Sequence, residues 1–274
     1  MKSGAKPVVV DSARAYDAYA GRYDSLLSEN RINAYMRSAM TSFEQETFQP
    51  GQRLLEVGCG TGDEAVALAS RGCNVVGTDP SKEMIRVARG KAEALHLERR
   101  LTFFVGYARD LERALASEAD ASFDGSYSSF ALSYENDLAS VRNALRRLLR
   151  PGGILLASVM NRMSGLEWAL ALGSLHPALA GRRLRPRTLH KVGVVETTVY
   201  CRTPEQLRRA LSPGFRLERL RGLPVMLPPH YVNRPLLRWP SLVSALGKLD
   251  ARVAGWPVLR DLGDHNVVWF RRSE

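Results

Sequence analysis

Short apolar runs alternate with amphipathic stretches from residue 52 onward. The segment 81–97 has apolar residues at 84, 85, 87, 88, 92 and 95, close to helical spacing, behind the N-cap residue Ser81. The segments 63–72 and 137–149 have the same helical character. Strands are predicted at 53–57, 74–78, 101–105, within 123–132 and at 154–159. Strands separated by helices form right-handed βαβ units, so we expect an α/β fold with a parallel sheet.

The pattern becomes less regular after Asn161. Helices are expected at 164–175, 203–211 and within 241–254, and strands at 191–200, 215–223 and 265–270. We therefore expect the sheet to be extended at one edge, with a partly helical cover inserted as 162–190 and 224–262. The predicted division is an N-terminal helical part (1–45), a core (46–161) and a part that completes the sheet and carries the cover (162–274).

Positive charge is concentrated in the second half of the chain. The sequence has 39 Lys and Arg against 28 Asp and Glu, a net charge of +11. Residues 1–150 contain 20 of each sign, which leaves 39 − 20 = 19 basic and 28 − 20 = 8 acidic residues for 151–274. This asymmetry suggests two different roles for the halves, although an arginine-rich genome would explain the excess equally well.

Composition excludes several classes of protein. A hydrophobic content of 45% is too high for a disordered chain. The three cysteines (Cys59, Cys73 and Cys201) are far apart and form neither a disulfide framework nor a zinc motif. There is no signal-peptide core and no apolar stretch long enough to span a membrane. We therefore expect a cytoplasmic globular protein.

A glycine-rich loop follows the first predicted strand, in the segment LLEVGCGTG (54–62). Its glycines allow a sharp turn and leave room for a ligand. The dinucleotide fingerprint requires Gly or Ala where this chain has Asp63, so that fingerprint fails. Glu56, Asp63 and Glu64 would repel a pyrophosphate, and they favour a ligand with positive charge.

Asp79 ends the second predicted strand, 23 residues after Glu56. An acid at this place in nucleoside-binding α/β folds accepts hydrogen bonds from the ribose hydroxyls. The site thus needs a ligand that has a ribose and positive charge but no pyrophosphate. S-adenosylmethionine meets these conditions, and we predict it as the cofactor, with S-adenosylhomocysteine as the product.

Four segments in this order resemble the class I S-adenosylmethionine-dependent methyltransferases: LLEVGCGTG, VVGTDPSKEMI, FDGSYSSFAL and LRRLLRPGGILLASV. The resemblance covers about residues 12–160 and implies a Rossmann-like, doubly wound, mostly parallel seven-stranded sheet. It implies that Glu56 orients the loop and that Gly58 and Gly60 lie under the methionine moiety. The other residues that it assigns to the cofactor are Cys59 and Thr61 in the loop, Asp79 at the ribose, Pro80 and Met84 at the adenine, and Ser128, Ser129 and Phe130 at the methionine end.

The segment after the third strand departs from the family pattern. Members of the family often have an acid there that contacts the adenine amino group, whereas this chain has Tyr107. The resemblance then implies that backbone groups of Ala108 and Arg109 hold the adenine, with Tyr107 stacking or packing beside it.

Residues 15–27 resemble the N-terminal helix that closes over the cofactor in small-molecule members of the family. We therefore expect residues 1–45 to form a helical lid. Tyr16, Tyr19 and Tyr23 would share one face of a continuous helix, where they could cap the cofactor and shape the methyl-transfer site. Ordinary helix packing is the alternative explanation of this tyrosine stripe.

Methyl transfer is a displacement at a sulfonium, so positioning and desolvation supply much of the catalysis. An oxygen acceptor would still profit from a general base. The candidates are Tyr134, Glu135, His176, His190, His230 and Tyr231. We prefer Tyr134, near the expected methyl end, and His230, in the proline-rich cover. His265 is expected to be structural, and no metal is expected, because the sequence has no cluster of metal ligands.

Three functions compete at this point. A methyltransferase acting on a small apolar or anionic acceptor, at oxygen, nitrogen or carbon, is favoured by the tyrosines and the apolar cover. An RNA or tRNA methyltransferase is the alternative, because the basic half contains the run GRRLRPR (181–187). A non-catalytic protein that binds the cofactor is the third. The apolar cover with its flanking arginines could also contact an anionic membrane surface.

Overall fold

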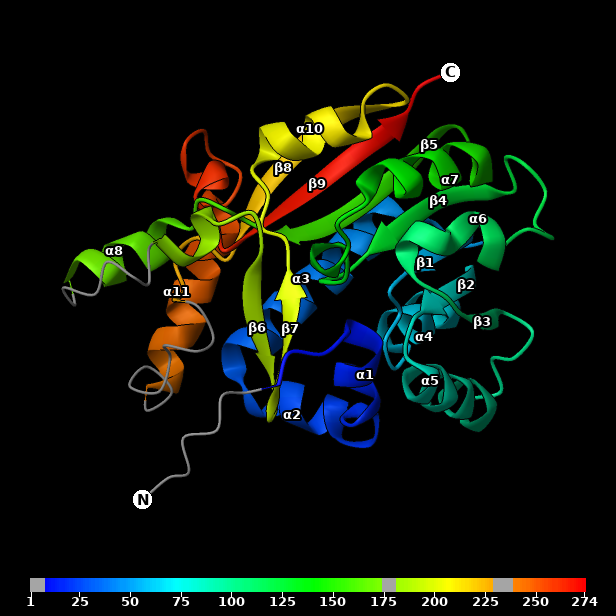
Figure 1. Ribbon diagram of the computed structural model, residues 1–274, viewed down its shortest axis with the longest axis horizontal. Coiled ribbons are helices and arrows are strands. Elements are labelled where there is room, and N and C mark those ends of the chain that lie inside the picture. The colour runs from blue at the N-terminus through cyan, green and yellow to red at the C-terminus, as the bar shows by residue number, and fades with distance from the viewer. Residues whose placement is uncertain (1–7, 174–180, 229–238) are drawn as a thin grey trace.

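The computed structural model describes residues 8–173, 181–228 and 239–274. Its centre is a seven-stranded sheet in the order β3-β2-β1-β4-β5-β9-β8 (Figure 1). The strands are β1 (Arg53–Val57), β2 (Asn74–Asp79), β3 (Leu101–Val105), β4 (Phe123–Ser128), β5 (Leu149–Met160), β8 (Phe215–Leu223) and β9 (His265–Arg272). The first five are parallel, and β9 runs antiparallel between β5 and β8. The predicted fold class, an α/β sheet that is mostly parallel, is therefore confirmed.

Helices cover both faces of this sheet, because residues alternate in direction along each strand. On β1, Leu54 belongs to one core cluster and Leu55 to the other. The first cluster includes residues of α3 (Arg31–Thr47), α4 (Asp63–Ser70), α5 (Lys82–Ala94) and α11 (Pro240–Val253). The second includes residues of α6 (Leu111–Ala114), α7 (Leu138–Leu148) and α10 (Pro204–Leu211). Ser81 caps α5 as predicted, with its hydroxyl accepting from the Met84 amide at 3.1 Å.

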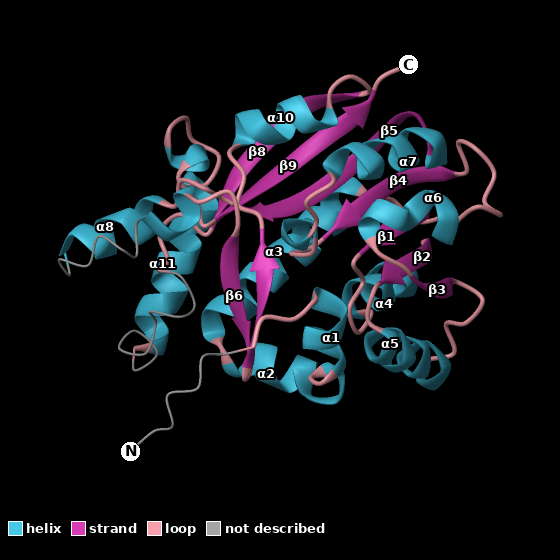
Figure 2. Ribbon diagram, viewed as in Figure 1, coloured by secondary structure: helices cyan, strands magenta, loops and turns pink. Residues whose placement is uncertain are grey.

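The predicted single strand at 191–200 is wrong. The chain instead forms a hairpin of β6 (Thr188–Val192) and β7 (Val195–Val199), which is separate from the main sheet (Figure 2). The reason is Gly193, whose φ of +57° allows a tight turn inside the apolar run. A third segment joins this hairpin, since the Val10 amide donates to the Glu196 carbonyl at 2.8 Å. The cover thus extends beyond residue 190, and it also includes α8 (Gly165–Gly173).

The N-terminal part is helical, but it is not one helix over 15–27. It consists of α1 (Ser12–Asp17), a 3-10 turn (Ala20–Arg22) and α2 (Tyr23–Glu29), followed by α3. In the described part of the chain, no helix has both the length and the apolar character needed to cross a membrane.

Candidate functional site

The glycine-rich loop after β1 is tied to the neighbouring strand. The amides of Gly58 and Cys59 both donate to the Thr78 carbonyl, at 2.7 and 2.9 Å. Gly58 has a φ of +79°, and a Cβ at this position would lie 2.1 Å from the Cβ of Ala131. This position therefore requires glycine. The Cys59 side chain is buried, and burial raises the pKa of its thiol, so it packs in the core rather than acting as a nucleophile.

Asp79 connects this loop to the end of β2. Its Oδ2 accepts from the Gly60 amide at 3.0 Å and its Oδ1 from the Ser81 amide at 2.9 Å. Burial raises the pKa of this carboxyl to about 6. A carboxylate has about four lone-pair sites, so Asp79 can accept further hydrogen bonds, such as those of two ribose hydroxyls. Pro80, the next residue, is half-buried at this same edge of the sheet.

Three buried carboxyl groups, on Glu44, Glu56 and Glu64, interact with one another near this loop. Burial, and next the charge of Glu64, raise the pKa of Glu44 to about 8 and that of Glu56 well above its usual range. Arg37 pairs with Glu64, with nitrogen and oxygen 3.3 Å apart. Oε2 of Glu44 has no hydrogen-bond partner among the described residues. Burial thus keeps Glu44 and Glu56 mostly protonated near pH 7, and a positive charge bound nearby would favour their ionised forms.

Ser128, the last residue of β4, and Ser129, the next residue, make hydrogen bonds to the sheet and to one of these acids. The Ser129 hydroxyl donates to Glu44 at 2.5 Å, and the Ser128 hydroxyl donates to the Val57 carbonyl at 2.7 Å. Both hydroxyls, which the sequence assigned to the methionine end of the cofactor, are thus used within the protein. Glu44 was missed by the sequence analysis, although it continues the buried i, i+4 stripe of Met36 and Met40 on α3.

Phe130 occupies a strained position at the carboxyl end of the sheet. Its φ is +62°, which is uncommon for a bulky residue, and its amide donates to the Ser158 hydroxyl at 2.8 Å. The ring lies edge-on to that of His265, with centroids 5.2 Å apart. Met84, predicted beside the adenine, is fully buried in the helix that follows β2.

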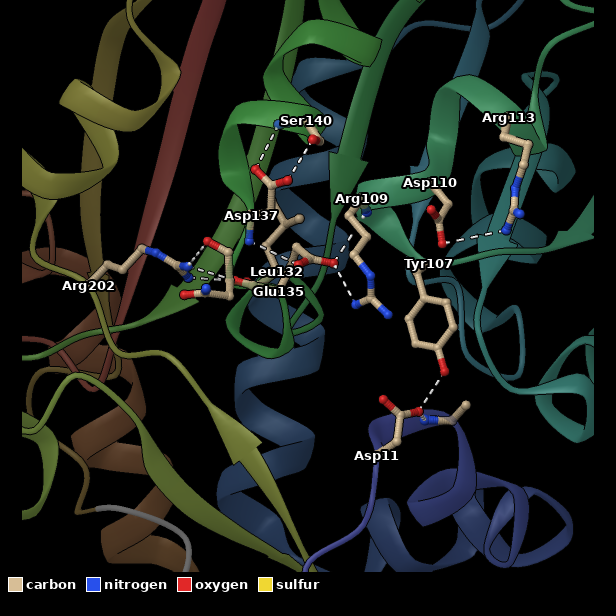
Figure 3. A network of polar contacts seen from close by, with 12 residues as sticks. Asp11, Tyr107, Arg109, Asp110, Arg113, Leu132, Glu135, Asp137, Ser140 and Arg202 are labelled. Atoms are coloured by element: carbon tan, nitrogen blue, oxygen red, sulfur yellow. Dashed lines mark hydrogen bonds and ion pairs between the residues drawn. The ribbon is translucent and has the colours of Figure 1, made fainter.

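The loop after β3 uses its polar groups to hold neighbouring segments (Figure 3). The Tyr107 hydroxyl donates to Asp11 at 2.6 Å, and the Arg109 guanidinium lies 4.1 Å from the centre of the Tyr107 ring. The Arg109 amide, which was predicted at the adenine, donates to Glu135 at 3.2 Å in this structure. Ala108, half-buried, begins the short 3-10 turn of this loop. Glu135 is buried and accepts these bonds, which makes it a structural residue.

The N-terminal segment makes a hydrogen bond to each of the four loops at the carboxyl edge of the sheet. Besides the Asp11–Tyr107 bond, these contacts are Thr61 to Asp24, Ser81 to Asp17, and Tyr16 with Tyr134, each at 2.6 Å. The acids at 17 and 24 directly follow Tyr16 and Tyr23, a repeated Tyr-Asp pair that the sequence analysis did not use. Segments held in this way would cover a ligand bound at these loops.

A cavity of about 380 Å³ lies between this segment, the carboxyl ends of β4 and β5, and the β6–β7 hairpin; we call it the acceptor cavity. Its aromatic and apolar lining consists of Tyr16, Tyr19, Tyr23, Leu26, Leu27, Met36, Phe130, Tyr134, Met160 and Val192. The rest of the lining consists of Gly193 and the polar residues Asn33, Arg37, Ser133, His190, Lys191 and His265. The break in the helix places Tyr19 at the hairpin, where its hydroxyl accepts from the Val194 amide at 3.0 Å.

The two candidate bases that we preferred have different outcomes. Tyr134 lines the cavity, but burial raises its pKa and that of its partner Tyr16. Both hydroxyls are therefore neutral hydrogen-bonding groups near pH 7. His230 lies outside the described residues, as do His176 and Tyr231. His265, which was expected to be structural, also lines the cavity. Among the described residues, no group of three or more His, Cys, Asp or Glu is arranged to hold a metal ion.

Comparisons with known proteins show the family of this chain. The family model described as "Methyltransferase domain" matches residues 54–153. A ubiquinone biosynthesis O-methyltransferase of Thiobacillus denitrificans is 31% identical over 63% of this chain and 68% of its own length. An O-methyltransferase of Aspergillus nomiae is 36% identical over 54% of this chain and 67% of its own length.

The overall fold also matches solved structures. The crystal structure of a [4+2]-cyclase is similar over 98% of this chain and 99% of its own, with a TM-score of 0.61 and 19% identity, which shows a shared fold.

This chain spans only about half the length of three further curated relatives. It covers 57%, 45% and 43% of their sequences.

Proposed function

Because the chain belongs to the class I S-adenosylmethionine-dependent methyltransferases, we propose that it methylates a small, largely apolar molecule held in the acceptor cavity. The observation that carries this proposal is the position of that cavity. Phe130 and Tyr134, which line it, follow β4 at the edge of the sheet where Asp79 and the glycine loop lie. A ligand on Asp79 and a ligand in the cavity would therefore be neighbours.

The residues present suit the cofactor. Asp79 would accept from the ribose hydroxyls, and the loop at Gly58 and Gly60 would lie under the methionine moiety. When bound, S-adenosylmethionine supplies a methyl group on a sulfonium, which is a good leaving group.

The chain itself supplies position and exclusion of water. The N-terminal segment would act as a lid, which excludes water from the site through its bonds to the four loops. Tyr16 and Tyr134, as neutral hydroxyls, would orient a polar group of the acceptor. The many aromatic side chains favour an acceptor with a flat apolar body, and Lys191 could meet an anionic group on it.

The arginine run, which supported an RNA substrate, supports it less strongly once its side chains are placed in the structure. Arg183 is 2% exposed, and Arg182 lies 3.6 Å from Glu167, so these two side chains pair within the protein. Arg185 and Arg187 are exposed. Steep salt dependence of micromolar binding to mixed RNA would favour that alternative. Contact with an anionic membrane surface stays a prediction, for which binding to vesicles with and without acidic lipid is the assay.

The test of the proposed function has two steps. Calorimetry should first detect binding of S-adenosylhomocysteine and S-adenosylmethionine. Radiolabelled S-adenosylmethionine should then transfer its methyl group to members of a panel of hydroxylated aromatic compounds, with tRNA as a competing acceptor. Labelling of tRNA alone, or failure to bind either form of the cofactor, would contradict the proposal.

A further inference from the structure

A buried acid and an imidazole, Asp264 and His265, stand together at the start of β9. His265 Nδ1 lies 2.9 Å from Oδ2 of Asp264. The two residues are 7% and 3% exposed, and His265 lines the acceptor cavity. The register pairs His265 with Met160 of β5, which lines the same cavity.

Asp264 is held from its other side by a buried arginine. The Arg183 guanidinium donates to Asp264 Oδ1 at 2.6 Å and to the Asp264 carbonyl at 2.9 Å. It also donates to the Asn161 carbonyl at 3.1 Å, and its Nε lies 2.5 Å from Glu167 of α8. These contacts fix the acid and favour its charged form. An arginine from the basic run is thus used to orient an acid rather than to meet a partner.

We propose that His265 is the general base of the reaction, and that Asp264 and Arg183 are its positioning residues. The 2.9 Å contact between Nδ1 and Asp264 lacks the angle of a hydrogen bond in this structure. The charge of the acid beside Nδ1 still favours the tautomer with the proton on Nδ1, which leaves the lone pair on Nε2. Nε2 has no hydrogen-bond partner among the described residues, and the ring lines the acceptor cavity. This inference rests on the proposed function and makes it more specific, because a base is needed by a hydroxyl acceptor.

In the proposed step, His265 takes a proton from the acceptor as the methyl group is transferred. The acceptor hydroxyl gives its proton to Nε2 of His265 while its oxygen bonds to the methyl carbon. The electron pair of the carbon–sulfur bond that breaks stays on sulfur. The positive charge that was on the sulfonium is afterwards on the imidazolium, next to the Asp264 carboxylate. The imidazolium then releases its proton to water.

The other titratable and charged groups around the cavity suit this role less well. Tyr16 and Tyr134 bond to each other, and burial disfavours their ionised forms. His190 is the competing imidazole; its ring lies edge-on to Tyr134, with centroids 6.2 Å apart. Asp264 lies beside His265, and Arg183 contacts Asp264. The charged and titratable groups that line the cavity together with His265 are Tyr16, Tyr19, Tyr23, Arg37, Tyr134, His190 and Lys191.

The first test needs neither cofactor nor acceptor. In full-length protein with ¹⁵N-labelled histidine, the signals of His265 are assigned by their loss in His265→Asn. At a pH where the ring is neutral, we expect the Nδ1–H tautomer. Asp264→Asn should shift the population toward Nε2–H, whereas Asp261→Asn, which removes a nearby surface charge, should not. A dominant Nε2–H tautomer in the wild type would overturn the proposal, because Nε2 would then carry a proton already.

The second test measures methyl transfer to 2-naphthol. His265→Asn should lower kcat about 100-fold or more and remove the acid limb of the pH profile, with S-adenosylhomocysteine affinity unchanged. Asp264→Asn should lower kcat less, and Asp261→Asn should not change it. If His190→Asn loses the acid limb and His265→Asn keeps it, our proposal is wrong. A wild type that methylates neither 2-naphthol nor any other hydroxylated aromatic contradicts the proposed function instead, while the tautomer measurement still decides on the dyad.

Discussion

Replacing Asp79 by alanine should remove most of the affinity for the cofactor. The carboxylate accepts the Gly60 and Ser81 amides and would accept two ribose hydroxyls in addition. Hydrogen bonds to a charged group contribute about 1.5–3 kcal/mol each. Losing the two ribose bonds should therefore cost about 3–6 kcal/mol, or roughly 150–25,000-fold in Kd. Calorimetry with S-adenosylhomocysteine at pH 7.5 measures this loss directly.

The pH dependence gives a second measurement of the same residue. Burial raises the pKa of Asp79 to about 6, so the carboxyl gains a proton as the pH falls through that value. At pH 5 about one tenth would be ionised, and the affinity of the wild type should be roughly tenfold lower than at pH 7.5. Asp79→Ala should lack this dependence. Asp120→Ala, which removes an exposed acid away from the site, should behave as the wild type. An unchanged Kd in Asp79→Ala would refute the assignment of the ribose site.

Three further predictions concern the acids, the lid and the hairpin. Glu44→Gln should be about as stable as the wild type at pH 4 and more stable by roughly 2–4 kcal/mol at pH 9, as measured by urea unfolding. The reason is that the folded-state pKa of Glu44 is raised to about 8, so the wild type loses stability as the pH rises toward and through that value. Asp17→Ala loses its bond to Ser81 and should raise the KM for the cofactor about 5–10-fold and speed hydrogen exchange in α1. Gly193→Ala places a Cβ 1.4 Å from the Tyr19 hydroxyl and should cost about 1–3 kcal/mol of stability and lower kcat.

Matched variants separate these effects from general damage. Glu46→Gln changes an exposed acid on the same helix as Glu44 and should not alter the pH dependence of stability. Glu29→Ala removes an exposed acid from α2 and should leave the KM unchanged. Gly181→Ala meets no atom within 4 Å and should be neutral. Each idea fails if the variant and its control behave alike.

The sheet and the cofactor loop could be predicted from the sequence because their signals are local. Apolar runs, helical spacing and glycines within a few residues of one another define β1 to β5 and the helices between them. The acid at 79 follows from its place at the end of β2. The hairpin was missed because a single glycine at 193, within an apolar run, decides between one strand and two.

The acceptor side could not be predicted, because its contacts join distant parts of the chain. Arg183 contacts Asp264, 81 residues away, and Asp264 in turn lies beside His265 in the cavity wall. Tyr16 meets Tyr134 across 118 residues. A lone histidine at the start of a strand gives no local signal of a cavity, which is why His265 was taken as structural.

A crystal structure with bound S-adenosylhomocysteine tests the central claim most directly. We predict that the ribose hydroxyls lie within hydrogen-bond distance of Asp79, that the homocysteine part lies over Gly58 and Gly60, and that the sulfur faces the acceptor cavity near Phe130. A ligand bound away from Asp79, or a sulfur that faces away from the cavity, would contradict the account.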